Sequence, residues 1–287
     1  MNISEASSLI HAREISPIEL IESHLERIET TEGSLNSFIT VFADEATESA
    51  IKATQDISRG RELGPLHGIP IGLKDLYDTA GTITTVGSQI YKDRIPSSDA
   101  TVVTKLREAG AIIIGKLQMH EFALGSTSVN PHYGPARNPW DLSRITGGSS
   151  GGSGSSVASG QCMGALGTDT GGSIRIPAGV CGIVGLKPTF GRVSRHGVFP
   201  LSWTMDTVGP MTRTVEDSAK LLNAMAGFDP LDPGSANVPI EDFAVNVGKD
   251  VSKMKIGVPQ EYFYDIISED VAGAVQAAQE VFLGLGA

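Results

Sequence analysis

Two stretches decide how this chain folds and what it does: ITGGSSGGSGSS at residues 145–156 and GTDTGGSIRIPA at residues 167–178. A segment of mostly small residues, 157–166, separates them, and its composition predicts that it is packed. Each stretch contains a Gly-Gly-Ser turn, one ending at Ser149 and the other at Ser173. Glycine pairs allow backbone conformations that are closed to other residues, and they leave amide N–H groups unshielded. A serine hydroxyl beside a row of free N–H donors is what an acyl-transfer site requires.

Three other interpretations of the serine-rich tract compete with this one. Gly/Ser-rich tracts are most often flexible linkers, but this tract has apolar and specific residues on both sides and a second Gly-Gly-Ser follows it. A phosphate-binding loop is excluded because no lysine follows the glycines. Gly147-x-Ser149-x-Gly151 matches the nucleophile elbow of hydrolases, which should follow a strand, whereas residues 138–144 are expected to form a loop. The only later histidine is His196, so the match to the elbow is weak.

The composition describes a soluble globular protein. The chain has 287 residues, of which 40% are hydrophobic and 19% charged, enough apolar residues for a sizeable core in one large domain or two ordinary ones. The net charge of −11 argues against a nucleic-acid backbone as the main partner, because neutralising phosphates requires a basic face.

The sequence shows neither a targeting signal nor a metal-binding pattern. The start, MNISE, lacks the basic and apolar regions of a signal peptide, and no apolar run approaches the length of a membrane span. Cys162 and Cys181 cannot form a disulfide framework and are expected to be reduced, buried residues of a cytoplasmic protein. The six histidines show no paired ligand spacing, so no metal site is expected.

The hydrophobic pattern predicts alternating helices and buried strands, which is typical of α/β layering. SPIE at 16–19 is a capping box with proline at the first helical position, and residues 111–115 are continuously apolar, as in a sheet covered on both faces. We expect helices after Ser16, over 44–58, from Asp99 to Gly110, from Thr214 to Met225 and after Ser268, and strands over 38–42, 69–73, 111–115, 182–186 and 255–258.

The two serine stretches, together with GIPIGLKD at 68–75 and CGIVGLKPT at 181–189, resemble the amidase signature family. The similarity runs from about Ser16 to the end of the chain and is most specific between Gly68 and Pro210. The resemblance implies an α/β fold in which a mixed, mostly buried sheet is sandwiched between helical layers. It also implies a hydrolase that uses neither a metal nor an organic cofactor.

The resemblance implies a Ser-Ser-Lys triad in which Ser173 is the acyl-forming nucleophile, Ser149 the bridging serine and Lys74 the base. It implies a cis peptide bond between Gly148 and Ser149. The chemistry agrees, since a serine hydroxyl needs a group that removes its proton, and a desolvated lysine can be neutral enough to do so. Lys74 ends the apolar run 69–73, where such desolvation is expected. The oxyanion hole would consist of the N–H groups of Thr170, Gly171, Gly172 and Ser173.

Each of these residues also has a structural interpretation. Lys74 beside Asp75 could form a surface ion pair, and the two serines could be turn residues. Asp169 and Arg175 are expected to hold their loop together by a charged hydrogen bond rather than to touch a substrate. An apolar group could line an acyl pocket, although such clusters are more often core: Met119, Phe122 and Leu124.

The leading functional hypothesis is a stand-alone amidase that hydrolyses a small carboxamide or an aryl or alkyl amide, acting alone or as a homodimer. The alternative is the amidase (glutaminase) subunit of the aspartyl/glutamyl-tRNA amidotransferase, working with partner subunits. That subunit usually has glutamine at the position of Ile176 and an Ala-Phe-Ala-Ser-Ser-like run at 199–203, where this chain has FPLSW. These departures favour the general amidase.

The chain stops at Ala287, where a further strand is expected, and family members usually continue well beyond this point. We therefore expect a single, truncated amidase domain. Its parts would be an N-terminal helical layer over 1–62, a catalytic core over 63–227, and a surface excursion with the start of a C-terminal part over 228–287. A third hypothesis follows, namely an inactive fragment whose cavity is incomplete.

Overall fold

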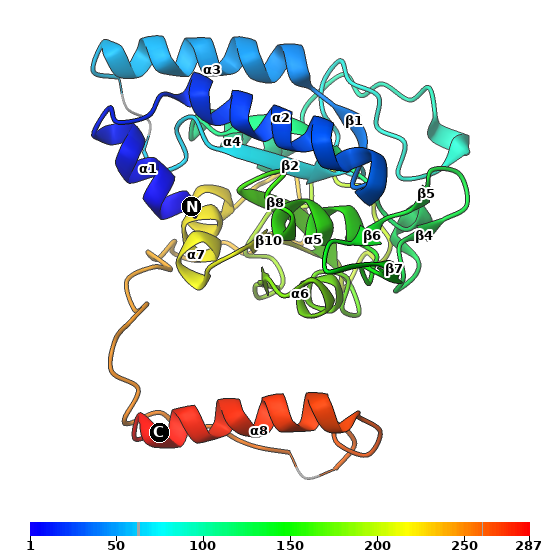
Figure 1. The fold of residues 1–287 in the computed structure, drawn as a ribbon, viewed down its shortest axis with the longest axis vertical. Coiled ribbons are helices and arrows are strands. Elements are labelled where there is room, and N and C mark those ends of the chain that lie inside the picture. Colours follow the sequence, from blue (N-terminus) through cyan, green and yellow to red (C-terminus); the bar gives the residue numbers. More distant parts are fainter. Residues whose placement is uncertain (62–63, 260) are drawn as a thin grey trace. The chain divides into compact units, whose positions relative to one another are not determined.

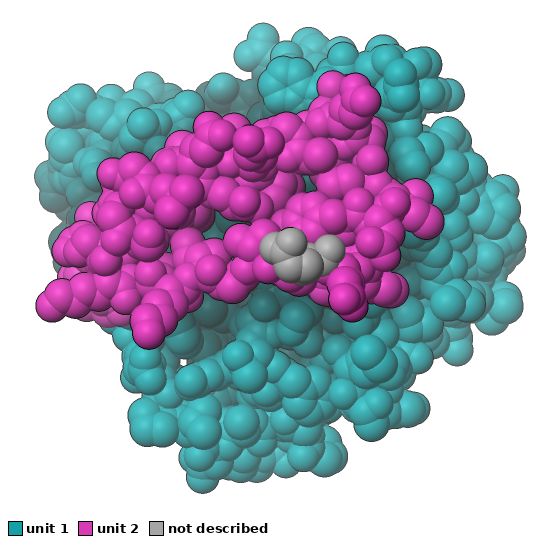
Figure 2. All heavy atoms as spheres, turned by 90° about the horizontal axis from the view of Figure 1, so that it is seen from below, with its two compact units in different colours: residues 1–244 teal, residues 245–287 magenta. Residues whose placement is uncertain are grey.

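The computed structural model describes residues 1–61, 64–259 and 261–287, and these divide into two compact units, 1–244 and 245–287 (Figures 1 and 2). The expected boundary between residues 62 and 63 lies outside the described residues.

A six-stranded mixed sheet forms the centre of the first unit, with the strand order β1-β3-β2-β8-β10-β9 (Figure 1). Strand β2 lies between β3 and β8 and runs parallel to both, while β1, β10 and β9 pair antiparallel with their neighbours. The strands are β1 (Phe38–Val41), β2 (Pro70–Lys74), β3 (Ile112–Leu117), β8 (Gly164–Asp169), β9 (Val184–Gly185) and β10 (Thr207–Thr212).

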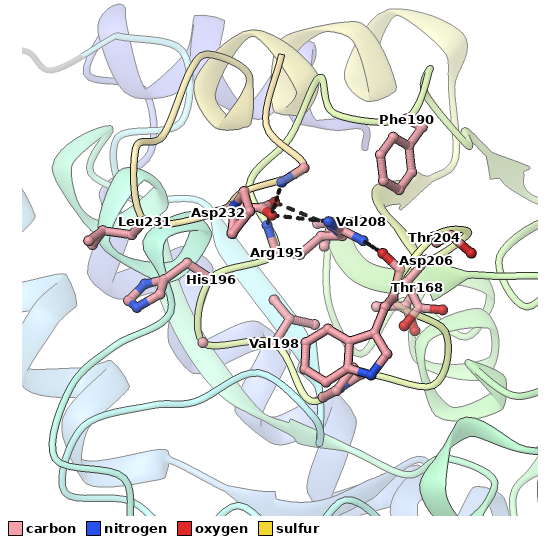
Figure 3. Close-up of a pocket in the computed structure, with 15 residues that line it drawn as sticks. Thr168, Phe190, Arg195, His196, Val198, Thr204, Asp206, Val208, Leu231 and Asp232 are labelled. Atoms are coloured by element: carbon pink, nitrogen blue, oxygen red, sulfur yellow. Dashed lines mark hydrogen bonds and ion pairs between the residues drawn. The ribbon is translucent and has the colours of Figure 1, made fainter. Parts of the chain in front are cut away.

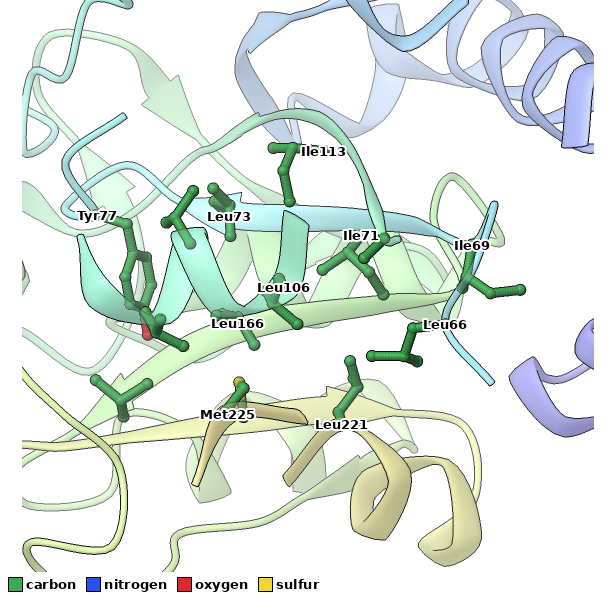
Figure 4. Close-up of a cluster of buried hydrophobic side chains, with 14 of the residues drawn as sticks. Leu66, Ile69, Ile71, Leu73, Tyr77, Leu106, Ile113, Leu166, Leu221 and Met225 are labelled. Atoms are coloured by element: carbon green, nitrogen blue, oxygen red, sulfur yellow. The ribbon is translucent and has the colours of Figure 1, made fainter. Parts of the chain in front are cut away.

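Helices cover both faces of this sheet, because its central strands are apolar on both sides. The helices of the first unit are α1 (Ile3–His11), α2 (Pro17–Leu35), α3 (Ala43–Ser58), α4 (Thr101–Glu108), α5 (Gly151–Ala158), α6 (Arg175–Cys181) and α7 (Val215–Met225). The side chains of β3 divide between two clusters. The cluster of Ile113 contains side chains of α1, α4 and α7 and also one each of α2 and α3, whereas the cluster of Ile112 and Ile114 is built from α2, α3 and α5. Figure 4 shows the first of these two clusters, in which Leu106 of α4 and Met225 of α7 share the core with Leu73 of β2 and Leu166 of β8. The predicted layered α/β fold is confirmed.

Several predicted helix starts are confirmed by the hydrogen bonds that satisfy their free N–H groups. Ser16 and Glu19 form the capping box of α2, and the Thr214 hydroxyl accepts from the Asp217 N–H at the start of α7. The predicted helix over 44–58 is α3, and it buries Ala46, Ala50 and Ala53 on one face. Both cysteines are buried and free.

Four predictions of local structure are wrong. Asp99 does not cap α4; its carboxylate accepts from the Ala80 N–H and pairs with Arg107. Residues 182–186 yield only the two-residue edge strand β9, and residues 255–258 form no strand. The presumed loop 138–144 is a hairpin of β6 (Arg137–Asn138) and β7 (Asp141–Ile145).

The remaining short elements of the first unit are a second two-stranded sheet and two 3₁₀ turns. They are β4 (Val129–Asn130), β5 (Gly134–Pro135), η1 (Gln89–Tyr91) and η2 (Glu121–Ala123).

The second unit contains helix α8 (Glu269–Gly284), which Ser268 caps as predicted. Throughout the described ranges, we find no helix that combines the length and the apolar character needed to cross a bilayer.

Candidate active site

Lys74 is the last residue of the central strand β2, and its side chain is fully buried. Its Nζ donates to the Ser149 Oγ at 2.7 Å and to the Thr168 Oγ1 at 2.9 Å. Both acceptors are hydroxyl groups rather than carboxylates. The interpretation of Lys74 as half of a surface ion pair with Asp75 is therefore wrong.

The surroundings of Lys74 favour its neutral form. Burial lowers the pKa of this amine from 10.5 to about 7, and the more distant negative charges of Asp206 and Asp169 oppose the shift. A lysine with a pKa near 7 is uncharged in about half of the molecules at neutral pH, so it can accept a proton as well as donate one.

Ser149 lies at the entrance to α5 and is also fully buried. The peptide bond between Gly148 and Ser149 is cis, as the family resemblance implies. Gly147 has a φ of +71°, and a Cβ on Gly152 would lie 2.4 Å from the Ser37 carbonyl oxygen, so both positions require glycine. A strand, β7, does precede this tract, but the buried Ser149 does not have the exposed position of a nucleophile elbow.

Ser173 lies in the loop between β8 and α6 and is partly exposed. The Ser150 N–H donates to the Ser173 carbonyl at 3.2 Å, which joins the two Gly-Gly-Ser turns. Among the described residues, no group hydrogen-bonds to the Ser173 hydroxyl. The structure thus brings Lys74 and Ser149 into contact and places the backbone of Ser173 beside them, without a hydrogen bond between the two serine hydroxyls.

Two carboxylates hold the Ser173 loop at its ends. Asp169 accepts from the Ile174 N–H at 3.1 Å and pairs with the Arg175 guanidinium at 2.9 and 3.0 Å. Burial opposes ionisation of Asp169, but these hydrogen bonds outweigh it and leave its pKa below the usual value. At the other end the Thr170 hydroxyl donates to Asp206. The predicted loop-holding role of Asp169 and Arg175 is confirmed.

The backbone of the same loop exposes amide donors. Gly172 has a φ of +139°, a conformation that favours glycine. Within the described chain, the N–H groups of Gly171, Gly172 and Ser173 donate to no protein acceptor. Donors that are left free near a serine hydroxyl can bind a developing oxyanion.

The sequence interpretation missed two polar features of the sheet. Thr168, which accepts from Lys74, lies in β8 and could have been suspected because a polar residue interrupts a buried strand. Lys116 is buried in β3, 3.6 Å from the Asp75 carboxylate, and donates to the Thr84 hydroxyl at 2.9 Å. Burial lowers the pKa of Lys116 to about 8 and raises that of Asp75. The lysine within the apolar run IIIGKL is the sequence signal that could have revealed the buried pair of Lys116 and Asp75.

The three expected acyl-pocket residues differ in burial, and two of them, Met119 and Phe122, belong to the same apolar cluster. Met119 is buried in the core, and the ring of Phe122 packs against Tyr91 and Phe199 at centroid distances of 6.1 and 5.9 Å. Leu124 is 71% exposed. A cavity of about 630 Å³ instead lies beside Thr168, with a wall formed mainly by residues 190–208 and 231–234 (Figure 3). No cluster of three or more His, Cys, Asp or Glu side chains suited to a metal occurs in the described part of the chain.

Comparison with known proteins identifies the family of this chain. The Amidase family profile matches residues 19–287. The A subunit of a glutamyl-tRNA(Gln) amidotransferase from Geobacter sp. strain M21 is 47% identical over all 287 residues, which cover 59% of that relative. The chain therefore spans about three fifths of the length of the curated relatives it matches.

Solved structures show the same fold. One belongs to the vestigial protein complex that reveals the evolutionary origins of an s-triazine catabolic enzyme; it has a TM-score of 0.96 and 40% identity, with 98% of this chain and 62% of that chain covered. Another is a bacterial aryl acylamidase, with a TM-score of 0.92 and 33% identity over 100% of this chain and 59% of that chain. The predicted family is confirmed: this chain belongs to the amidase signature family.

Proposed function

We propose that this chain carries the catalytic machinery of an amidase and cleaves a carboxamide C–N bond through an acyl-enzyme. The observation that carries the proposal is the fully buried Lys74, whose Nζ lies 2.7 Å from the Ser149 hydroxyl and whose pKa is about 7. A neutral lysine amine can remove the proton of a neighbouring serine. Because that serine is linked to the turn of a second serine, the same amine can activate the second hydroxyl as a nucleophile.

In the proposed cycle, Ser173 attacks the amide carbonyl while its proton passes to Ser149, whose own proton passes to Lys74. The negative oxygen that forms is stabilised by the free N–H groups of the Ser173 loop. The C–N bond then breaks as the leaving amine takes a proton back through Ser149. Water finally attacks the acyl-Ser173 ester, activated by the same relay, and releases the acid. The relay requires a hydrogen bond from the Ser173 hydroxyl to Ser149 during the reaction.

An active-site label tests this proposal without knowledge of the substrate. We expect a fluorophosphonate to modify Ser173, as located by peptide mass spectrometry, and we expect Lys74→Ala or Ser149→Ala to slow the modification strongly. Ser143→Ala changes an exposed hairpin serine and serves as the matched control. Labelling at the control rate in Lys74→Ala would refute the relay, and an aggregated chain that is never labelled would support the inactive fragment.

A second function is favoured by the 47% identity to the A subunit of the Geobacter amidotransferase over the entire chain. In that role the same relay would release ammonia from glutamine and would depend on partner subunits. The similarity to the aryl acylamidase structure supports the general amidase instead. Glutaminase activity measured with and without partner subunits separates the two functions, because activity on glutamine only in the complex would contradict the stand-alone amidase.

A further inference from the structure

Three fully buried titratable side chains near Lys74 have no part in the proposed reaction: Asp75, Tyr77 and Lys116. Asp75 and Tyr77 follow Lys74 closely in the chain, and Lys116 lies on the neighbouring strand β3. Burying an ammonium and a carboxylate is costly unless both are paired and hydrogen-bonded. What these groups contact therefore shows what the protein gains from burying them.

Lys116 holds the tight turn that follows Lys74. The Lys74 carbonyl accepts from the N–H groups of Leu76 and Tyr77, at 2.7 and 3.2 Å, so the chain turns directly after β2. At the end of this turn the Tyr77 carbonyl accepts a hydrogen bond from the Lys116 Nζ. The position of the proposed base thus depends on a turn that a second buried lysine fastens to β3.

The remaining donors of Lys116 go to the segment that follows the turn. Its Nζ donates to the Thr84 hydroxyl at 2.9 Å and to the Thr79 hydroxyl at 3.3 Å. An ammonium group has three N–H donors, so these two hydroxyls and the Tyr77 carbonyl use all of them. The hydrogen-bonding capacity of Lys116 is therefore spent on the chain just after Lys74.

Asp75 supplies the charge that offsets Lys116. One of its carboxylate oxygens lies 3.6 Å from the Lys116 Nζ, and the other accepts from the Thr85 N–H at 2.9 Å. Asp78 and Arg94 also influence Lys116, but they are paired with each other at 2.7 and 2.8 Å. Lys116 and Asp75 thus form one buried unit around the turn.

Tyr77 connects the turn to β8. The ladder between β2 and β8 ends one residue before Lys74. Beyond it the Tyr77 hydroxyl donates to the Gly167 carbonyl at 2.7 Å, so a side chain continues the contact that the backbone has left. Figure 4 shows the Tyr77 ring among the buried side chains of this region. The next residue of β8 is Thr168, whose hydroxyl accepts from Lys74 at 2.9 Å.

We propose that Lys116, together with Asp75 and Tyr77, is a positioning residue for Lys74. It fixes the turn at the end of β2 and, through Tyr77, the end of β8, so that the Lys74 amine stays within reach of Ser149. The inference rests on the proposed amidase function and adds to it residues that touch neither the substrate nor the reacting atoms. A displacement of about 1 Å can cost about 100-fold in rate, so loss of these contacts should be measurable.

Two variants remove these contacts without leaving a buried charge. Lys116→Met alone would leave the Asp75 carboxylate buried and unpaired, which destabilises a fold strongly. Lys116→Met combined with Asp75→Asn removes both charges and leaves the net charge unchanged, so we expect this double variant to fold. Tyr77→Phe removes only the hydroxyl that reaches β8.

Lys105→Met is the matched control. Lys105 is a partly buried lysine of α4 that also donates to backbone carbonyls, those of Met225 at 3.3 Å and Ala226 at 2.8 Å. These carbonyls lie at the end of α7 rather than beside Lys74. The control therefore loses the same kind of contact at a different place.

The pKa of Lys74 is a readout that a merely structural role would not move. NMR of the chain labelled with ¹³C at lysine Cε measures it whether or not Ser173 reacts, and Lys74→Met assigns the resonance. From about 7 in the wild type, this pKa should rise by about half a pH unit or more in the double variant, because water that reaches a less tightly held amine favours its charged form. It should rise in the same direction in Tyr77→Phe and stay in place in Lys105→Met.

The rate of Ser173 labelling per folded molecule is the second readout. We expect a plateau about tenfold lower in the double variant and about threefold lower in Tyr77→Phe, with the wild-type rate in Lys105→Met. The inference is overturned if the folded double variant keeps the wild-type pKa of Lys74 or the wild-type rate. Should that variant fail to fold, Tyr77→Phe decides by the same readouts.

The two readouts also separate this inference from the proposed function. If the wild-type chain is never labelled, the amidase proposal falls, and the pKa of Lys74 in the double variant alone decides whether Lys116 positions the amine. If the wild type is labelled normally and the double variant matches Lys105→Met, the amidase proposal stands and only the positioning role of Lys116 is removed.

Discussion

Replacing Lys74 with methionine should change how the stability of the protein depends on pH. The folded chain holds this amine at a pKa of about 7, against a usual value of 10.5. Between these two pH values the unfolded chain binds a proton that the folded chain lacks. Stability must therefore rise with pH in this window, by up to about 1.4 kcal/mol per pH unit. From pH 7 to pH 9 the gain is about 2 kcal/mol, once partial protonation at pH 7 is included.

Methionine fills similar space but does not titrate. The free energy of unfolding of the wild-type chain minus that of Lys74→Met should consequently increase by about 2 kcal/mol from pH 7 to pH 9. Loss of the hydrogen bonds to Ser149 and Thr168 shifts this difference by a constant and does not alter its slope. Titration of other groups, including Lys116, occurs in both proteins and cancels.

Urea unfolding at half-unit steps of pH measures both free energies. Lys52→Met, which replaces an exposed lysine on α3, is the matched control and should show no such slope. A difference that stays constant between pH 7 and pH 9 would refute the conclusion that the folded protein holds Lys74 largely uncharged. A difference that falls with pH would mean that folding favours the charged amine.

Three further predictions concern the residues around Lys74. Ser149→Ala and Ser173→Ala should each lower kcat by on the order of 10⁴-fold or more while leaving the urea midpoint near that of the wild type; unchanged turnover in the Ser173 variant would defeat the mechanism. Asp206→Asn removes a charge that raises the pKa of Lys74, so the acidic limb of the pH–rate profile should move to lower pH, and a limb that stays in place would contradict this. Asp169→Asn weakens the pair with the half-exposed Arg175 and should cost about 0.5–1 kcal/mol in urea unfolding and slow the labelling of Ser173. An unaltered unfolding curve would show that the pair does not hold the loop.

Much of the fold could be predicted from local sequence patterns. The buried strands β2 and β3 are continuous apolar runs, and the starts of α2 and α7 have side chains that cap their own backbone. These signals depend on a few neighbouring residues, so they can be recognised without knowledge of the rest of the fold.

The errors arise where a distant contact decides the local structure. Asp99 has a good capping sequence, but Arg107 and the Ala80 N–H occupy its carboxylate. Residues 182–186 are apolar enough for a core strand, yet only β9 pairs, because it lies at the edge of the sheet against β10. The hairpin of β6 and β7 is exposed along β7 and carries no hydrophobic alternation to reveal it.

The candidate site also has parts that could be predicted from the sequence and parts that could not. The motifs at 68–75 and 145–178 locate Lys74, Ser149 and the Ser173 loop through their resemblance to a known family; taken alone, Lys74 beside Asp75 could equally indicate a surface ion pair. The cavity could not be located from the sequence because segments around residues 168, 200 and 232 meet only in the fold. The apolar residues Met119, Phe122 and Leu124 have the composition of a pocket, which core and surface positions share.

The proposed mechanism depends on an uncharged Lys74 that activates Ser173 through Ser149. The rate of fluorophosphonate labelling at Ser173, followed from pH 5 to pH 10, tests this dependence most directly. We predict a rate that rises to half of its maximum near pH 7, where Lys74 loses its proton. A rate that still rises toward pH 10, as expected for a lysine with its usual pKa, would contradict the mechanism.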